Sequence, residues 1–198
     1  MNPERNMQGK TVLITGATDG IGEETARQLA GMGASVLVHG RDRKKAAQVK
    51  DDINRTTGNQ QVEIVIADLA VMENVRVLAG EVRDRVKHLD VLINNAGVYM
   101  DEYVETEDGY ERTFAVNHLA HFLLTNLLLD LLEKSAPARI ITVSSSAHAS
   151  ARVDLNNLTA EKKFHGWGAY CLSNLGNLLF TFALVRRLEG TGVTANAL

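Results

Sequence analysis

Three glycines within seven residues follow the first apolar run of the chain, residues 11–15. They are Gly16, Gly20 and Gly22, and helical spacing of apolar residues resumes after them. Glycine permits a tight turn and a close approach of a ligand to the backbone, and the free N–H groups at a helix start attract phosphate. The sequence therefore predicts a dinucleotide phosphate site in this loop, formed by Gly16, Thr18, Asp19, Gly20, Ile21 and Gly22.

The spacing GxxxGxG departs from the GxGxxG pattern usual in dinucleotide-binding loops. The same residues could form an ordinary turn from strand to helix, in which glycine serves only the geometry. The rest of the chain is needed to choose between the two interpretations.

The residues after the second apolar run, 35–39, indicate which dinucleotide would bind. Arg41 lies 19 residues after Gly22, where NAD sites usually carry an acidic residue and NADP sites an arginine for the 2′-phosphate. A guanidinium binds phosphate through two parallel hydrogen bonds. Asp42 fits the N-cap of the following helix better than a ribose ligand. We therefore predict NADP, with a solvated basic helix start at 41–45 as the alternative.

These residues must be positioned by elements that alternate along the chain. Strands are expected at 11–15, 35–39, 62–67, 89–94, 139–144 and 192–198, and helices at 21–32, 41–56, 71–86 and 106–132. Such alternation predicts an α/β fold, a doubly wound parallel sheet of the Rossmann type in three layers. In the first helix, the residues expected to face the sheet are Ile21, Thr25, Leu29 and Met32.

Ligands of such sheets bind outside the carboxyl ends of the strands. Asp68 follows the third strand and could contact an adenine or cap the helix 71–86. Small residues and an amide follow the fourth strand, where they would let the backbone lie close to a ligand. The further cofactor contacts predicted at this edge are Asp68, Leu69, Asn95, Ala96 and Gly97.

The composition is that of one soluble domain, 1–198, with a net charge of −3 that gives no reason to expect nucleic acid. Cys171 is the only cysteine, so no intramolecular disulfide can form. The polar start of the chain lacks a signal peptide core, and the apolar segment 119–132 is too short to cross a bilayer. We expect a cytoplasmic protein without a membrane span.

Two other kinds of chemistry fit the sequence poorly. His118 and His121 share a helix face, but no third ligand accompanies them, so no metal site is expected. Ser145 and His148 could suggest a serine hydrolase, but no GxSxG motif surrounds the serine.

Several motifs together resemble one family over nearly the whole chain. They are TGATDGIG at 15–22, NNAG at 94–97, Asn117 in NHLAHF, the serines of ITVSSSAH, and AYCLSN at 169–174. This set resembles the short-chain dehydrogenase/reductases, closest to their retinol dehydrogenase-like branch. The resemblance implies a Rossmann sheet, a nicotinamide cofactor and interconversion of an alcohol with its carbonyl compound, here an apolar one.

The resemblance also implies a catalytic unit at Ser145, Tyr170, Asn117 and Asn174. Tyr170 would exchange a proton with the carbonyl oxygen, Ser145 would hydrogen-bond the same oxygen, and Asn117 would hold helix backbone and water in place. Asn117 could equally be a polar helix residue that contacts a neighbour. Tyr170 and Asn174 would also contact the cofactor.

Asn174 departs from the family, whose Tyr-x-x-x-Lys motif is here Tyr-Cys-Leu-Ser-Asn. An amide can keep a ribose hydrogen bond but carries no charge to favour the ionised tyrosine. We therefore expect NADP binding with poor turnover in both directions. An inactivating substitution, a natural pseudoenzyme and a variant with another proton route remain open, as does a silent NADP(H)-binding protein that acts through a partner.

Three further expectations follow from the resemblance. The sequence stops where the family continues with a substrate-covering segment, so an incomplete pocket and an exposed sheet edge are expected. The loop between Ser145 and Tyr170 contains Trp167, which could face an apolar substrate or pack beneath the loop. The family often forms dimers through the helices near Asn117 and Tyr170, so a homodimer is possible.

Overall fold

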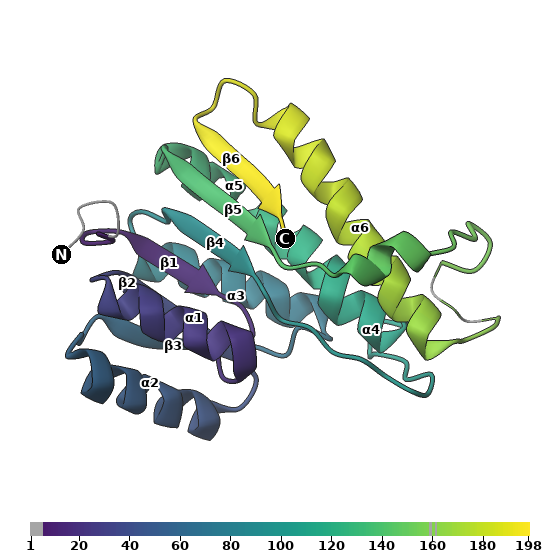
Figure 1. Cartoon of the computed structure of the whole chain (residues 1–198), viewed down its shortest axis with the longest axis horizontal. Helices are drawn as coiled ribbons and strands as arrows, with labels where there is room; N and C mark the ends of the chain where they lie inside the picture. Colours follow the sequence, from purple (N-terminus) through teal and green to yellow (C-terminus); the bar gives the residue numbers. More distant parts are fainter. Residues whose placement is uncertain (1–5, 159, 161) are drawn as a thin grey trace.

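The computed structural model describes residues 6–158, 160 and 162–198, and its centre is a parallel six-stranded sheet (Figure 1). The spatial order is β3-β2-β1-β4-β5-β6. The strands are β1 (Thr11–Ile14), β2 (Ser35–Gly40), β3 (Val62–Ile66), β4 (Val91–Asn94), β5 (Ala138–Thr142) and β6 (Val193–Ala197). The predicted strands are thus confirmed, with ends that differ by at most two residues. The prediction from the polar chain start falls partly on residues 1–5, outside the described residues.

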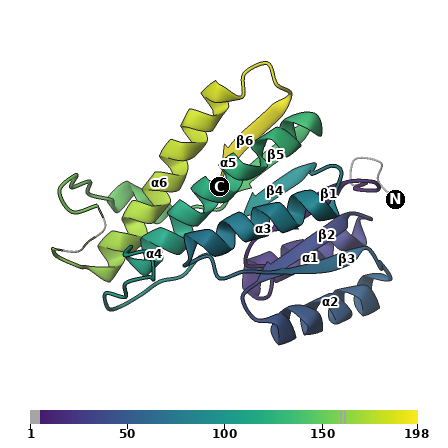
Figure 2. The same cartoon turned by 180° about the vertical axis from the view of Figure 1, so that it is seen from behind.

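Helices cover both faces of the sheet, as Figures 1 and 2 show from opposite sides. Alternate residues of the strands point to opposite faces, so Leu13 and Val12 belong to different cores. The helices are α1 (Gly20–Gly31), α2 (Arg43–Thr57), α3 (Met72–Arg85), α4 (Arg112–Phe114), α5 (Ala120–Lys134) and α6 (Gly166–Arg187). One core is formed with α1 and α2, the other with α3, α5 and α6. The doubly wound α/β prediction is confirmed.

The predicted inner face of α1 is wrong at Ile21, whereas Leu29 packs against the core as predicted. The helix buries Gly22, Ala26 and Ala30, whereas the Ile21 side chain is 72% exposed. Small side chains bring this helix close to the sheet, and the larger apolar residues at helical spacing lie on a neighbouring face.

The helix predicted at 106–132 begins six residues later. Thr106 N–H donates to the Tyr110 carbonyl in a turn, and the Glu111 carboxylate then caps α4 by accepting from the N–H groups of Thr113 and Phe114 at 2.7 and 2.8 Å. Between α4 and α5, the turn η2 (Ala115–Leu119) is π-helical. This turn contains Asn117.

Two capping predictions had different outcomes. Asp42 is the N-cap of α2 and accepts from the N–H groups of Lys44 and Lys45, as predicted. Asp68 does not cap α3, because its carboxylate accepts from Ala70 N–H at 2.9 Å. The first N–H of α3 donates instead to Asp108, which is distant in sequence.

Two helical segments, Arg112–Lys134 and Gly166–Arg187, are long and apolar enough to cross a membrane. Both contribute to the core against the sheet, the first through Leu124 and Leu128 and the second through Phe180 and Leu184. Helices of a soluble core pass the same test of length and composition, so the absence of a membrane span stays a prediction.

Candidate active site

The glycine loop packs so closely on the end of β4 that side chains could not replace Gly16 or Gly22. Gly16 has φ +63°, and a Cβ there would lie 2.7 Å from Ala96 Cα. A Cβ on Gly22 would lie 2.4 Å from both Asn95 Nδ2 and the Gly16 carbonyl oxygen. The loop therefore offers exposed backbone where a larger residue would block a ligand.

The Thr15 hydroxyl ties this loop to the start of the NNAG segment. Its oxygen accepts from the N–H groups of Asn95 and Ala96 at 2.8 and 3.0 Å. Asn95 Nδ2 donates in return to the carbonyls of Thr15 and Gly16 at 2.8 and 3.2 Å. His121 Nε2 lies 3.0 Å from the same hydroxyl. The ends of β1 and β4 thus form one rigid edge.

His39, at the end of β2, is a site residue that the sequence analysis missed. Its Nδ1 accepts from Gly16 N–H at 3.2 Å, so the ring hydrogen on Nε2 donates to the Ala67 carbonyl, also at 3.2 Å. Burial lowers the pKa of His39 to about 4, so the ring is neutral at physiological pH. The one feature of the sequence that could have indicated His39 is that it is a polar residue at the end of the apolar run SVLVH.

A cleft of about 620 Å³ runs along this edge of the sheet. It brings together nearly all predicted cofactor residues, which come from the first, second, third and fourth strand ends and from α6. They are Gly16, Thr18, Asp19, Gly20, Ile21, Gly22, Arg41, Asp68, Leu69, Asn95, Ala96, Gly97 and Tyr170. The lining residues that were not predicted are His39, Gly40, Ala67, Val98, Tyr99, Val116 and Val143.

The charged groups at the end of the cleft beside the glycine loop differ in their partners. Asp19 caps α1 by accepting from Gly20 N–H at 2.8 Å and pairs with Lys45 at 2.5 Å, which lowers the pKa of the Asp19 carboxyl. Arg41 lines the cleft and has no hydrogen bond or ion pair within the described part of the chain. The cleft thus combines a glycine cradle, an N-terminal helix end and an open guanidinium, which fits a phosphorylated dinucleotide.

Tyr170 lies at the other end of the cleft between two aromatic rings. The Tyr99 ring stands edge-on to it at a centroid distance of 5.8 Å, and the Trp167 ring lies at 6.0 Å. Ser145 caps the short helix η3 (Ser146–Ser150), where its Oγ accepts from Ala147 N–H at 3.2 Å. Within the described residues its hydroxyl hydrogen has no acceptor. Ser145 itself is not among the residues that line the cleft.

Asn117 is buried in η2 and holds the loop that follows β4. Its Oδ1 accepts from Val98 N–H at 2.8 Å, and its Nδ2 donates to the Val98 carbonyl at 2.9 Å. Ser173 Oγ lies 3.3 Å from the same Nδ2. Asn117 therefore fixes the backbone from which the neighbouring Tyr99 reaches Tyr170.

Asn174 is predicted to contact the cofactor and is not among the residues that line the cleft. Its side chain is buried, and Nδ2 donates to the carbonyl of Tyr170, one turn earlier, at 2.9 Å. A short amide satisfies this local bond, whereas the longer stem of a lysine would reach beyond it. Tyr170 and Asn174 lie on one face of α6, but the Asn174 amide bonds to the helix backbone and not to the Tyr170 side chain.

The remaining candidate groups have structural partners. His118 Nδ1 lies 3.1 Å from Asn177 Oδ1, and His121 bonds Thr15 and the Asn117 carbonyl. Within residues 6–158, 160 and 162–198, no three potential ligands gather into a metal site. The expectation that no metal binds stays a prediction.

Three comparisons place the chain among known proteins. A family model described as short chain dehydrogenase matches residues 10–198. Human retinol dehydrogenase 11 is 50% identical over 188 residues, which are 95% of this chain and 59% of that protein. This chain therefore spans about three fifths of the length of that relative.

Solved structures agree with the family match. An uncharacterized protein from Mycobacterium Paratuberculosis has a TM-score of 0.83 at 42% identity, over 97% of this chain and 68% of that one. The Pseudomonas aeruginosa RhlG/NADP active-site complex has a TM-score of 0.82 at 27% identity, over 100% of this chain and 74% of that one. From its sequence, its parallel sheet and these matches, the chain belongs to the short chain dehydrogenase family.

Proposed function

We propose that this chain binds NADP(H) and interconverts an apolar alcohol with its aldehyde or ketone. The observation that carries the proposal is one cleft with the glycine cradle and Arg41 at one end and Tyr170 at the other. Among the described residues, Arg41 has no hydrogen-bond or ion-pair partner. The name of the human relative, retinol dehydrogenase 11, and the NADP in the Pseudomonas aeruginosa complex support the same reading.

The residues present fit the cofactor. The backbone of the loop from Gly16 to Gly22 would hold the pyrophosphate, Arg41 the 2′-phosphate, and Asp68 and Leu69 the adenine end. Asn95, Ala96 and Gly97 would lie against the nicotinamide half. When bound, the cofactor supplies or accepts a hydride.

The chain's own residues provide the proton and hold the reacting oxygen. The Tyr170 hydroxyl would give its proton to the carbonyl oxygen during reduction and take it back during oxidation. The Ser145 hydroxyl, whose oxygen accepts from Ala147 N–H, would donate its hydrogen to the same carbonyl oxygen. Tyr99 and Trp167 surround Tyr170 with aromatic surface that favours an apolar substrate.

A second candidate function is a catalytically silent NADP(H)-binding protein. The observation that favours it is Asn174, whose neutral amide is buried and bonds the Tyr170 carbonyl. NADPH consumption with a panel of aromatic and aliphatic aldehydes separates the two functions. Turnover that is lost in Tyr170→Phe excludes silence.

Cofactor choice is tested by fluorescence titration with NADPH and NADH. We expect NADPH to bind more tightly, and Arg41→Gln to weaken NADPH about tenfold or more while NADH changes little, because only NADPH carries the 2′-phosphate. Arg43→Gln, an exposed neighbour that does not line the cleft, is the matched control. Equal binding of both cofactors, or equal effects of the two substitutions, would contradict the assignment to Arg41.

A homodimer and a cytoplasmic location are further proposals. Apolar side chains that are about half exposed on α5 and α6, among them Phe122, Leu179 and Phe182, support a dimer through these helices. Light scattering of the wild type and of Phe182→Glu tests the dimer, and cell fractionation tests the location.

A further inference from the structure

His39 and Asn95 hold two successive peptide units of the glycine loop from opposite sides. In the unit between Thr15 and Gly16, the carbonyl accepts from Asn95 Nδ2 at 2.8 Å. The N–H of the same unit donates to His39 Nδ1 at 3.2 Å. In the unit between Gly16 and Ala17, the carbonyl accepts from the same amide at 3.2 Å and the N–H donates to the His39 carbonyl at 2.9 Å. The left-handed turn at Gly16, with φ +63°, is therefore fixed on both sides.

The His39 ring is itself held in place by the end of a third strand. It is 3% exposed, and its Nε2 donates to the Ala67 carbonyl at 3.2 Å. Because burial lowers the pKa of His39 to about 4, the ring is neutral at physiological pH and Nδ1 remains an acceptor. The backbone after β3 thus orients the ring, and the ring orients the Gly16 peptide.

The N–H groups at the other end of the loop have no such partner. Those of Ile21 and Gly22, in the first turn of α1, have no acceptor among the described residues. Unpaired N–H groups at a helix start bind phosphate. His39 therefore takes the N–H groups of Gly16 and Ala17, and the donors at the helix start stay open for a ligand.

We propose that His39 is a positioning residue for the cofactor, whose Nδ1 acceptor holds the glycine loop in the conformation that binds the pyrophosphate. This role rests on the proposed function, because His39 lines the same cleft. Without the acceptor, the loop would occupy its binding conformation for only part of the time, and the apparent affinity would fall by that fraction. NADPH and NADH should be affected alike, since both carry the pyrophosphate.

Two substitutions separate the two hydrogen bonds of the ring. His39→Asn places a carboxamide oxygen near the position of Nδ1, so the acceptor for Gly16 N–H is kept and the donor to Ala67 is lost. His39→Gln places an amide nitrogen near the position of Nε2, so the donor is kept and the acceptor is lost. In fluorescence titrations, His39→Gln should weaken NADPH and NADH by about tenfold each, whereas His39→Asn should stay within about threefold of the wild type.

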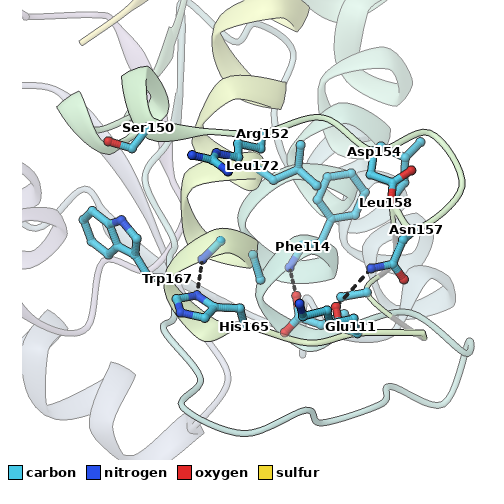
Figure 3. A pocket seen from close by; sticks show the side chains of 14 residues that line it. Glu111, Phe114, Ser150, Arg152, Asp154, Asn157, Leu158, His165, Trp167 and Leu172 are labelled. Atoms are coloured by element: carbon cyan, nitrogen blue, oxygen red, sulfur yellow. Dashed lines mark hydrogen bonds between the residues drawn. The ribbon is translucent and has the colours of Figure 1, made fainter.

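His165 provides a matched control, because it forms the same kind of hydrogen bond outside the cleft. Its Nδ1 accepts from Gly168 N–H at 3.2 Å, which is the dashed line at His165 in Figure 3. The second cavity drawn there shares no described lining residue with the cofactor cleft. His165→Gln should therefore leave both nucleotide affinities unchanged, and Arg41→Gln should weaken NADPH alone.

Hydrogen exchange of the Gly16 amide tests the same bond without a cofactor. Followed by NMR, the exchange rate reports how often this N–H loses its acceptor. Under conditions in which urea titration shows every variant to be folded, exchange should be about tenfold faster in His39→Gln and close to the wild-type rate in His39→Asn. A general loss of stability would speed the exchange of many amides, so a merely structural role would not single out Gly16.

Unchanged nucleotide affinities in His39→Gln, or equal losses in the Gln and Asn variants, would overturn the proposal and leave the cofactor assignment intact. An unchanged Gly16 exchange rate in His39→Gln would overturn it as well. If the wild type binds neither nucleotide, the proposed function fails and this role of His39 fails with it. Should His39→Asn not fold, His39→Gln is compared with His165→Gln, and equal affinities of these two variants would refute the positioning role.

Discussion

Replacing Asn174 with lysine should accelerate turnover by tenfold or more. In α6, Asn174 follows Tyr170 by one turn and is 5% exposed. Its side-chain amide donates a hydrogen bond to the Tyr170 carbonyl. No cation is hydrogen-bonded to Tyr170 in the described part of the chain. A lysine at this position would add a positive charge near the group that must carry negative charge when its proton leaves.

The size of the effect follows from the spacing. Side chains at i and i+4 on a helix are separated by about 6 Å, and two unit charges at that distance interact by about 3 kcal/mol at an effective dielectric constant near 20. This energy corresponds to about a hundredfold in rate if the transition state feels all of it. Removing an ammonium group from water at a nearly buried position opposes the gain, so tenfold is the expected minimum.

The assay is NADPH consumption with an aldehyde, followed for the wild type, Asn174→Lys and Asn174→Met. Methionine has a long unbranched stem without charge, so it controls for the loss of the amide bond and for the added length. The lysine variant should gain in kcat more than in KM, and its pH–rate profile should shift to lower pH. Adding Tyr170→Phe to the lysine variant should abolish the gain.

Equal rates in the lysine and methionine variants would refute the charge argument, because only one of them carries the charge. A rate gain that survives Tyr170→Phe would assign the effect to another group.

Three further predictions concern stability and acid. Gly22→Ala should lower the free energy of unfolding by about 1 to 3 kcal/mol and abolish NADPH binding, since the new Cβ overlaps the Asn95 amide. Urea titration measures the stability and fluorescence measures the binding. An unchanged urea midpoint would contradict the close packing at Gly22. Burial lowers the pKa values of His39 and His121 to about 4, so the unfolded chain binds protons from about pH 6.5 downward before the folded one does, and stability falls as pH drops from 6.5 toward 4. At pH 5 each of the two histidines should lower the free energy of unfolding by about 2 kcal/mol. His121→Gln should reduce this loss at low pH. A free energy of unfolding of the wild type that does not change between pH 7 and 5 would contradict this prediction. Glu111→Ala should lower the free energy of unfolding by about 1 to 3 kcal/mol, because one buried and one partly buried N–H group lose their acceptor. Glu111→Gln keeps one acceptor oxygen and should lose less stability. Equal losses in the two variants would assign the effect to packing.

The central strands β1, β2 and β4 could be predicted because each is an apolar run that is buried on both faces. The strands β3, β5 and β6 carry exposed polar residues between buried ones. The residues of the cleft at the sheet edge were also predictable, since glycines, Arg41 and the NNAG segment come directly after the strands. Both signals are local in sequence, and the parallel topology then brings them together.

What escaped prediction depends on contacts between distant segments. Asp108 reaches the first N–H of α3, and Glu111 rather than Thr106 starts a helix. The hydrogen bonds of His39 to Gly16 and Ala67 form only where the ends of three strands meet. The hydrogen bond of Asn174 to the Tyr170 carbonyl forms because its side chain turns back on its own helix. Spacing along the chain contains none of this information.

The π-helical turn η2 sets a limit on how this segment can vary in length. It carries one residue more than a regular helical turn, with Ala120 N–H bonded to the Ala115 carbonyl. Deleting one residue there would rotate everything beyond it by about 100°. Either Asn117 would leave Val98, or Leu124 and Leu128 would turn away from the core. Single-residue deletions at 115–119 should therefore be far more damaging than deletions in the exposed loop at 152–156, although both change the chain by the same length.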